Sequence, residues 1–154
     1  MYILKSVMIS VFILLVCSGC GSPVMSESEV SASPVGQPMN PGKARIYVIR
    51  ILSSNPLIAG KVKDGDRTIG SLRQNTYLCW DREPGDTILR TSRSASLSTA
   101  KENLFELPLH AEAGKAYYVM QQWRGQVPRL VFLKEDYAKK KLADCKPVKV
   151  TVAN

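Results

Sequence analysis

The sequence has a single histidine, His110, which strand alternation places on an outward face just before a turn. A lone imidazole argues against histidine-based catalysis and against a histidine-rich metal site. The sequence also lacks a nucleotide-binding glycine loop, a complete calcium loop and a serine-hydrolase elbow. We therefore expect no metal and no cofactor. Ten glycines and nine prolines in 154 residues are too few for a low-complexity chain, and 45% hydrophobic residues are enough for one folded domain.

No hydrophobic run is long enough to span a membrane. The longest, residues 7–16, would extend about 15 Å as a helix, half of a roughly 30 Å hydrocarbon core. Lys5 precedes this run, and the small residues Ser18 and Gly19 follow it. A basic start, an apolar centre and a small-residue end predict a secretory signal peptide over residues 1–19.

This signal ends in Cys17-Ser18-Gly19-Cys20. The motif resembles that of bacterial lipoprotein signal peptides, which are cleaved before a cysteine that has received a diacylglyceryl group. The resemblance implies lipidation of Cys20; an ordinary secreted protein is the alternative. Cys17 stands where leucine is usual in that family, and bulky Val16 before it makes it a poor acceptor. Gly21 replaces the aspartate associated with inner-membrane retention, so the resemblance favours the outer membrane, with the protein facing the periplasm.

Serine, proline and glycine make up 12 of the 23 residues from 21 to 43. Because this segment has no apolar periodicity, it predicts a flexible tether that reaches roughly 25–30 Å on average. The expected organisation is therefore a signal peptide over 1–19, a lipidated cysteine and tether over 20–43, and a folded domain over 44–154.

The folded domain shows short runs of β-branched and aromatic residues between turn signals. In residues 45–52, alternation groups Tyr47, Ile49 and Ile51 on one face, which we expect to face the core. Asp64-Gly65-Asp66 predicts a hairpin turn. Pro108 lies on the outward face of the 104–109 strand, which is typical of an edge strand or a bulge.

One helix is expected near the C-terminus, where acidic residues precede lysines. Its predicted apolar stripe comprises Tyr137, Ala138, Leu142 and Cys145. A last strand over 148–152 would close the sheet. Seven or eight short strands and one short helix predict an antiparallel β-sandwich, with a small barrel as the alternative.

Several short motifs follow in a fixed order along the folded domain. They are Ala44-Arg45-Ile46-Tyr47-Val48 with Arg50, Ile69-Gly70 with Leu72, Tyr77, Pro84-Gly85, Ala113-Gly114-Lys115 with Tyr117-Tyr118-Val119, and Ala138 with Leu142. Their order resembles a family of small bacterial lipoproteins catalogued as domain of unknown function 2846. The resemblance implies an all-β envelope domain and supplies no activity and no catalytic residue.

Cys79 and Cys145 are the only cysteines of the folded domain. An even pair in an exported chain predicts a disulfide. The bond would close a 67-residue loop, for which loop entropy predicts about 4 kcal/mol of stabilisation at most. The alternative is two thiols, with Cys79 on a buried strand face.

Without the signal peptide the chain keeps 20 of its 21 basic residues against 13 acidic ones, a net charge of +7. Its cations are spread along the sequence rather than gathered in one stripe. Nucleic acid is not an expected partner of an exported protein. We expect the membrane, through the lipid, and an envelope protein or anionic polymer. Trp123 and Arg124 are the candidate interaction residues, and a buried aromatic is the alternative for Trp123.

Asp81, Glu83 and Asp86 surround the Pro84-Gly85 turn. Glycosidases use two carboxylates that flank the bond they cleave, so an envelope glycan or peptidoglycan hydrolase is the rival hypothesis. We favour a non-enzymatic interaction domain, because Arg82 lies among these acids and acidic turns are common.

Overall fold

The computed structural model describes residues 34–51, 56–93, 105–125 and 127–150. The predicted signal peptide, Cys20 and residues 151–152 of the expected last strand lie outside this range. Within it, no helix has the length and apolar character needed to cross a bilayer.

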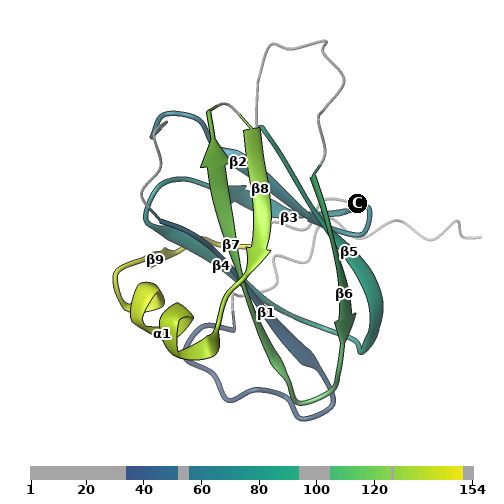
Figure 1. Ribbon diagram of the computed structural model, residues 1–154. Helices are drawn as coiled ribbons and strands as arrows, with labels where there is room; N and C mark the ends of the chain where they lie inside the picture. Colours follow the sequence, from purple (N-terminus) through teal and green to yellow (C-terminus); the bar gives the residue numbers. More distant parts are fainter. Residues whose placement is uncertain (1–33, 52–55, 94–104, 126, 151–154) are drawn as a thin grey trace, which may run out of the picture.

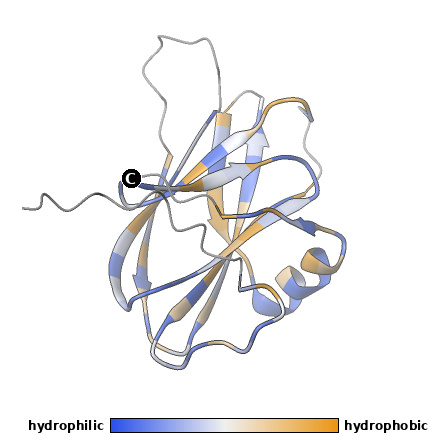
Figure 2. Cartoon of the chain, turned by 180° about the vertical axis from the view of Figure 1, so that it is seen from behind, coloured by the Kyte–Doolittle hydropathy of each residue, from blue (hydrophilic) through white to orange (hydrophobic). Residues whose placement is uncertain are grey.

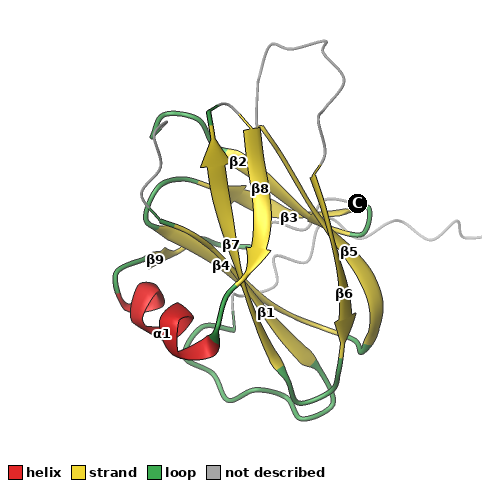
Figure 3. Cartoon of the chain, in the orientation of Figure 1, coloured by secondary structure: helices red, strands yellow, loops and turns green. Residues whose placement is uncertain are grey.

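The described residues form nine strands and one helix (Figure 3). The elements are β1 (Ala44–Arg50), β2 (Gly60–Asp64), β3 (Arg67–Leu72), β4 (Thr76–Arg82), β5 (Gly85–Arg93), β6 (Phe105–Ala111), β7 (Ala116–Arg124), β8 (Val127–Phe132), α1 (Glu135–Ala143) and β9 (Lys146–Pro147).

The strands build two sheets (Figure 1). The first sheet has the order β8-β7-β1-β4-β9, and the second has the order β3-β2-β5-β6. Side chains from both sheets meet in one apolar core, which includes Ile46, Val48, Leu78, Leu89 and Val119, each fully buried. The fold is thus the predicted β-sandwich and not a closed barrel. Its strands are not all antiparallel, because β1 runs parallel to β7, and β4 to β9.

Strand β1 is buried on both faces. Ile46 and Val48 point into the core between the sheets. Tyr47, Ile49 and Ile51 belong to a second apolar cluster on the outer face of the first sheet. We predict from the sequence that Tyr47, Ile49 and Ile51 face the core; they pack in the outer cluster, but the main core lies on the opposite face, with Ile46 and Val48. When both faces of a strand are buried, hydrophobic alternation does not show which face packs against the main core.

Helix α1 covers part of this outer face (Figure 1). Ala138 is fully buried there, and Leu142 and Cys145 pack against the same cluster. Figure 2 shows hydrophobic and hydrophilic residues together on this helix. Tyr137 departs from the predicted apolar stripe: it is 46% exposed.

The folded part begins before the predicted boundary at residue 44. Pro34 is buried, and Val35 packs against the outer cluster. The backbone carbonyls of Gln37 and Pro38 accept hydrogen bonds from the Arg45 guanidinium at 2.7 and 3.2 Å. Residues 34–43 are therefore part of the domain rather than of the tether, because backbone carbonyls hold a segment that has no apolar period.

Two local predictions are confirmed and one is wrong. The hairpin turn joins β2 to β3, with Gly65 at a φ of 61°. Strand β6 forms an edge of the second sheet, with Pro108 exposed. Of the expected strand over 148–152, the described residues 148–150 are not in a strand, although Val148 N–H donates to the Tyr77 carbonyl at 2.9 Å. The two-residue β9 lies just before them.

The predicted disulfide is not formed, since Cys79 and Cys145 are both thiols. Both lie in the outer cluster, but strand register separates them. Thr76 of β4 pairs with Lys146 of β9, so Cys145 lies level with Asn75. Cys79 is four residues further along β4, about 13 Å at a strand's rise, whereas a disulfide needs Cα atoms within roughly 7 Å.

Candidate functional site

The three turn carboxylates of the hydrolase hypothesis do not converge. Asp81 forms an ion pair with Arg45 on the outer face of the first sheet. Glu83 pairs with Lys43 at 3.0 Å, and its side chain is 73% exposed. Asp86 lies on β5 in the second sheet, beside His110. Each acid has a different cationic or imidazole partner, and Asp81 and Asp86 belong to different sheets. The turn therefore does not bring Asp81 and Asp86 together on either side of a substrate bond, as a glycosidase requires.

Asp81 and Arg45 are the centre of a mostly buried polar group. Arg45 Nε and Nη2 donate to the two carboxylate oxygens at 2.7 and 3.0 Å. The hydrogen bond to Asp81 raises the pKa of Arg45. Beside the pair, burial raises the pKa of Tyr47 and that of Cys79, each to about 12. Tyr47 also stacks on Tyr118, with ring centroids 5.1 Å apart. These groups are neutral or paired, so they stabilise the fold.

A second polar contact joins the two sheets. Asp64 of β2 accepts hydrogen bonds from Trp80 Nε1 at 3.0 Å and from Arg82 Nη1 at 2.9 Å, both on β4. It also accepts one from the Thr87 hydroxyl at 2.5 Å. The sequence presents Asp64 only as a turn residue, because its partners lie 16 to 23 positions away.

Trp123 lies against a buried arginine and a buried glutamine. Its ring lies 4.7 Å from the guanidinium carbon of fully buried Arg50, and its Nε1 donates to Gln121 Oε1 at 3.4 Å. Arg50 Nη1 donates in turn to the Leu72 carbonyl at 2.9 Å. Arg124, by contrast, is exposed at the end of β7. Of the two predicted interaction residues, Arg124 is exposed and Trp123 is partly buried.

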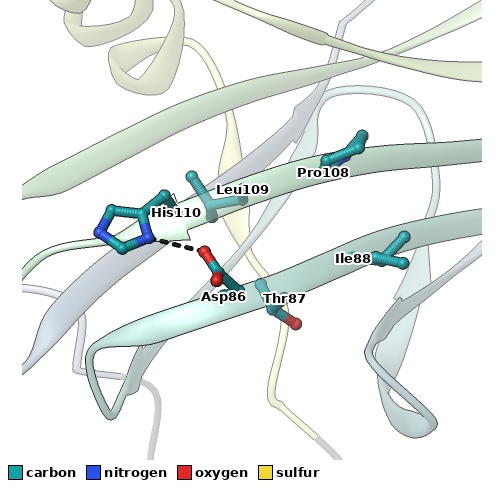
Figure 4. A pocket seen from close by; sticks show the side chains of 6 residues that line it. All are labelled: Asp86, Thr87, Ile88, Pro108, Leu109 and His110. Atoms are coloured by element: carbon teal, nitrogen blue, oxygen red, sulfur yellow. Dashed lines mark hydrogen bonds and ion pairs between the residues drawn. The ribbon is translucent and has the colours of Figure 1, made fainter.

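His110 and Asp86 face one another across β5 and β6 (Figure 4). His110 Nδ1 lies 2.6 Å from Asp86 Oδ1, with the side chains 68% and 89% exposed. Sequence reasoning found both residues but not the pair, because a cross-strand neighbour 24 positions away leaves no local signal.

The same face continues along the two strands as a row of cross-strand pairs. After Asp86 and His110 comes the apolar pair Ile88 and Pro108, and after that Arg90 with Glu106. The last pair is joined by a 2.8 Å ion pair from Arg90 Nε. We call these six residues the β5–β6 face. A shallow hollow of about 520 Å³ opens at its first end, lined by Asp86, Thr87, Ile88, Pro108, Leu109 and His110 (Figure 4).

The β5–β6 face combines polar pairs with an apolar pair. Thr87 directs its hydroxyl to Asp64, away from the imidazole, so it is not a nucleophile for His110. In the described ranges, no group of three or more histidine, cysteine or acidic side chains is placed to hold a metal ion. An exposed apolar pair between two polar pairs can receive an apolar side chain and hydrogen-bond its neighbours.

The fold and the site define a two-sheet β-sandwich domain with a shallow surface face. No protein-family model matches the chain, and no curated protein matches it significantly. The resemblance to domain of unknown function 2846 therefore stays a prediction.

Proposed function

We propose that this chain is a lipoprotein of the bacterial cell envelope, anchored through Cys20, whose β-sandwich binds an envelope protein without catalysing a reaction. The outer membrane, with the domain facing the periplasm, is its proposed location. The anchor rests on the Cys17-Ser18-Gly19-Cys20 motif at the end of the signal sequence.

The β5–β6 face is the single observation that carries the binding function. It exposes Pro108 and half-exposes Ile88 between two hydrogen-bonded polar pairs. A solvated strand face has no need of an apolar pair, whereas a protein interface commonly centres on one with a polar rim.

The charges of this face favour a protein over an anionic envelope polymer. Asp86 and Glu106 place two carboxylates along it, with exposed fractions of 89% and 51%. A polyanion would meet like charge there, which disfavours binding. A polypeptide with an apolar residue beside a basic one would meet complementary groups.

Site-specific photo-crosslinking in the envelope tests this function. A photoreactive amino acid at position 88 should form a discrete covalent adduct with one envelope protein. The matched control is position 71, because Ser71 is exposed on β3 of the same sheet but outside the β5–β6 face. The adduct should weaken when Asp86→Lys reverses the charge of the face. Equal crosslinking from positions 71 and 88, or no adduct from either, would contradict the proposed binding face.

A further inference from the structure

We propose that the exposed side of α1 rests on the anionic phospholipid surface of the membrane that carries the anchor, and so fixes the orientation of the domain. This inference depends on the proposed lipid anchor. The surface comprises Lys134, Tyr137, Lys140 and Lys146, which we call the α1 patch.

Lysines outnumber acidic residues in this part of the chain. Residues 132–146 contain five lysines and three acids. Lys139 is paired with Glu135 at 2.7 Å. Lys134, Lys140 and Lys146 are all exposed, and no ion pair to them is found among the described residues. Lys115, by contrast, pairs with Glu112 at 2.8 Å. Uncompensated lysines are the groups that an anionic lipid surface attracts.

An exposed aromatic ring lies on the same helix as Lys140. Tyr137 of α1 is 46% exposed. Lys141 Nζ lies 5.6 Å from the Tyr137 ring centroid, so this ring carries a cation against it. At the level of the lipid headgroups an aromatic ring can be partly buried while a neighbouring lysine stays hydrated. An aromatic ring beside lysines is therefore suited to this part of the membrane.

The path of the chain brings this side of the domain to the membrane. Val35 packs in the outer cluster together with Ala138 and Leu142 of α1, so the fold begins beside the helix (Figure 1). Thirteen residues, 21–33, separate Cys20 from Pro34. Fully extended they span at most about 45 Å, and they join the domain on the side that α1 covers. A short tether raises the effective concentration of α1 at the membrane surface, so even a weak contact between α1 and the lipid is formed.

The β5–β6 face is a poorer candidate for the same contact. It carries Asp86 and Glu106, which an anionic surface repels, and it lies on the second sheet, whereas α1 covers the first. With α1 on the membrane, the second sheet stays available to a partner.

Lysine labelling on vesicles tests the orientation without requiring lipidation. The chain from residue 20, with Cys20→Ser and an N-terminal hexahistidine, is held on vesicles by a nickel-chelating lipid. Acetylation rates are then measured by mass spectrometry. On vesicles with phosphatidylglycerol, Lys134, Lys140 and Lys146 should react about fivefold more slowly than on phosphatidylcholine vesicles. Lys63 of β2 is the internal control and should react equally on both. High salt should remove the protection.

A pair of variants separates the patch from net charge. In Lys134→Gln/Lys140→Gln, Lys146 should lose its protection; in Lys63→Gln/Arg67→Gln, with the same charge change on the other sheet, it should keep it. Uniform labelling of all lysines, or equal effects of the two variants, would overturn the orientation. Because the hexahistidine replaces the lipid, that outcome would leave the proposed anchor intact. Absence of lipid on Cys20 would reject the anchor instead.

Discussion

Arg45 and Asp81 form a two-bond ion pair, with Nε–Oδ1 at 2.7 Å and Nη2–Oδ2 at 3.0 Å, across β1 and β4. The pair is mostly buried, with side-chain exposures of 6% and 21%. The same guanidinium also binds the carbonyls of Gln37 and Pro38. The Arg45 side chain thus links residues 37–38 to Asp81 of β4.

Asp81→Asn should lower the free energy of unfolding by about 3 kcal/mol, because it leaves the buried guanidinium without its counter-charge. Glu83→Gln is the control, since Glu83 is mostly exposed and should leave the denaturation midpoint unchanged. Chemical denaturation measures both. If Asp81→Asn instead kept full stability but abolished cell-wall turnover, the hydrolase hypothesis would be favoured.

Asp64→Ala should destabilise the sandwich by about 3 kcal/mol, because it removes the acceptor for Trp80, Arg82 and Thr87 between the sheets. Asp66 provides a matched control in the same hairpin. Its side chain is fully exposed, so Asp66→Ala should unfold with the wild-type midpoint. Thermal unfolding of the two variants gives the comparison, and equal midpoints would refute the inter-sheet role of Asp64.

Thiol counting tests the absence of the disulfide. In the chain from residue 20 with Cys20→Ser, denatured protein should show two thiols both before and after reduction. In the folded state Cys79 should be almost unreactive, because it is fully buried and burial raises its pKa to about 12. A gain of two thiols on reduction would show that the bond forms.

Stability should fall on the alkaline side. Burial raises the pKa of Tyr47 from 10.0, and that of Cys79 from 9.0, to about 12 in each case. The unfolded chain therefore loses these protons first, so their contribution is complete below pH 9 and is lost as pH rises towards 12. Tyr47→Phe should reduce the loss of stability between pH 8 and pH 11. Tyr137→Phe, at an exposed ring, should not; an identical pH dependence for Tyr47→Phe and wild type would contradict this account.

Local patterns predicted much of the fold, because alternation and turn chemistry act over a few residues. Gly65 and Pro108 indicated a hairpin and an edge strand, and both are present. The parallel pairing of β1 with β7 joins residues about 70 positions apart, and no local signal encodes it. For the same reason, the register that separates Cys79 from Cys145 was not predictable.

The sequence indicates individual residues of the candidate site but not their contacts. The sequence indicates Asp86 as one of three turn acids and His110 as a lone imidazole, but their pairing depends on the register of β5 and β6. Trp123 is predicted as an interaction residue, with a buried aromatic as the alternative; its ring lies beside Arg50, whose burial no charge pattern indicates. The early start of the fold at Pro34 depends on hydrogen bonds from Arg45 to backbone carbonyls, which composition does not reveal.

The most direct test of the central claim is the intact mass of the protein purified from the membrane fraction. We predict a mature chain that begins at Cys20 and carries added acyl mass on that residue. Cys17→Ser should leave this product unchanged, and Cys20→Ser should abolish it. A membrane-bound chain that begins at another residue, or that begins at Cys20 without acyl groups, would contradict the lipoprotein account.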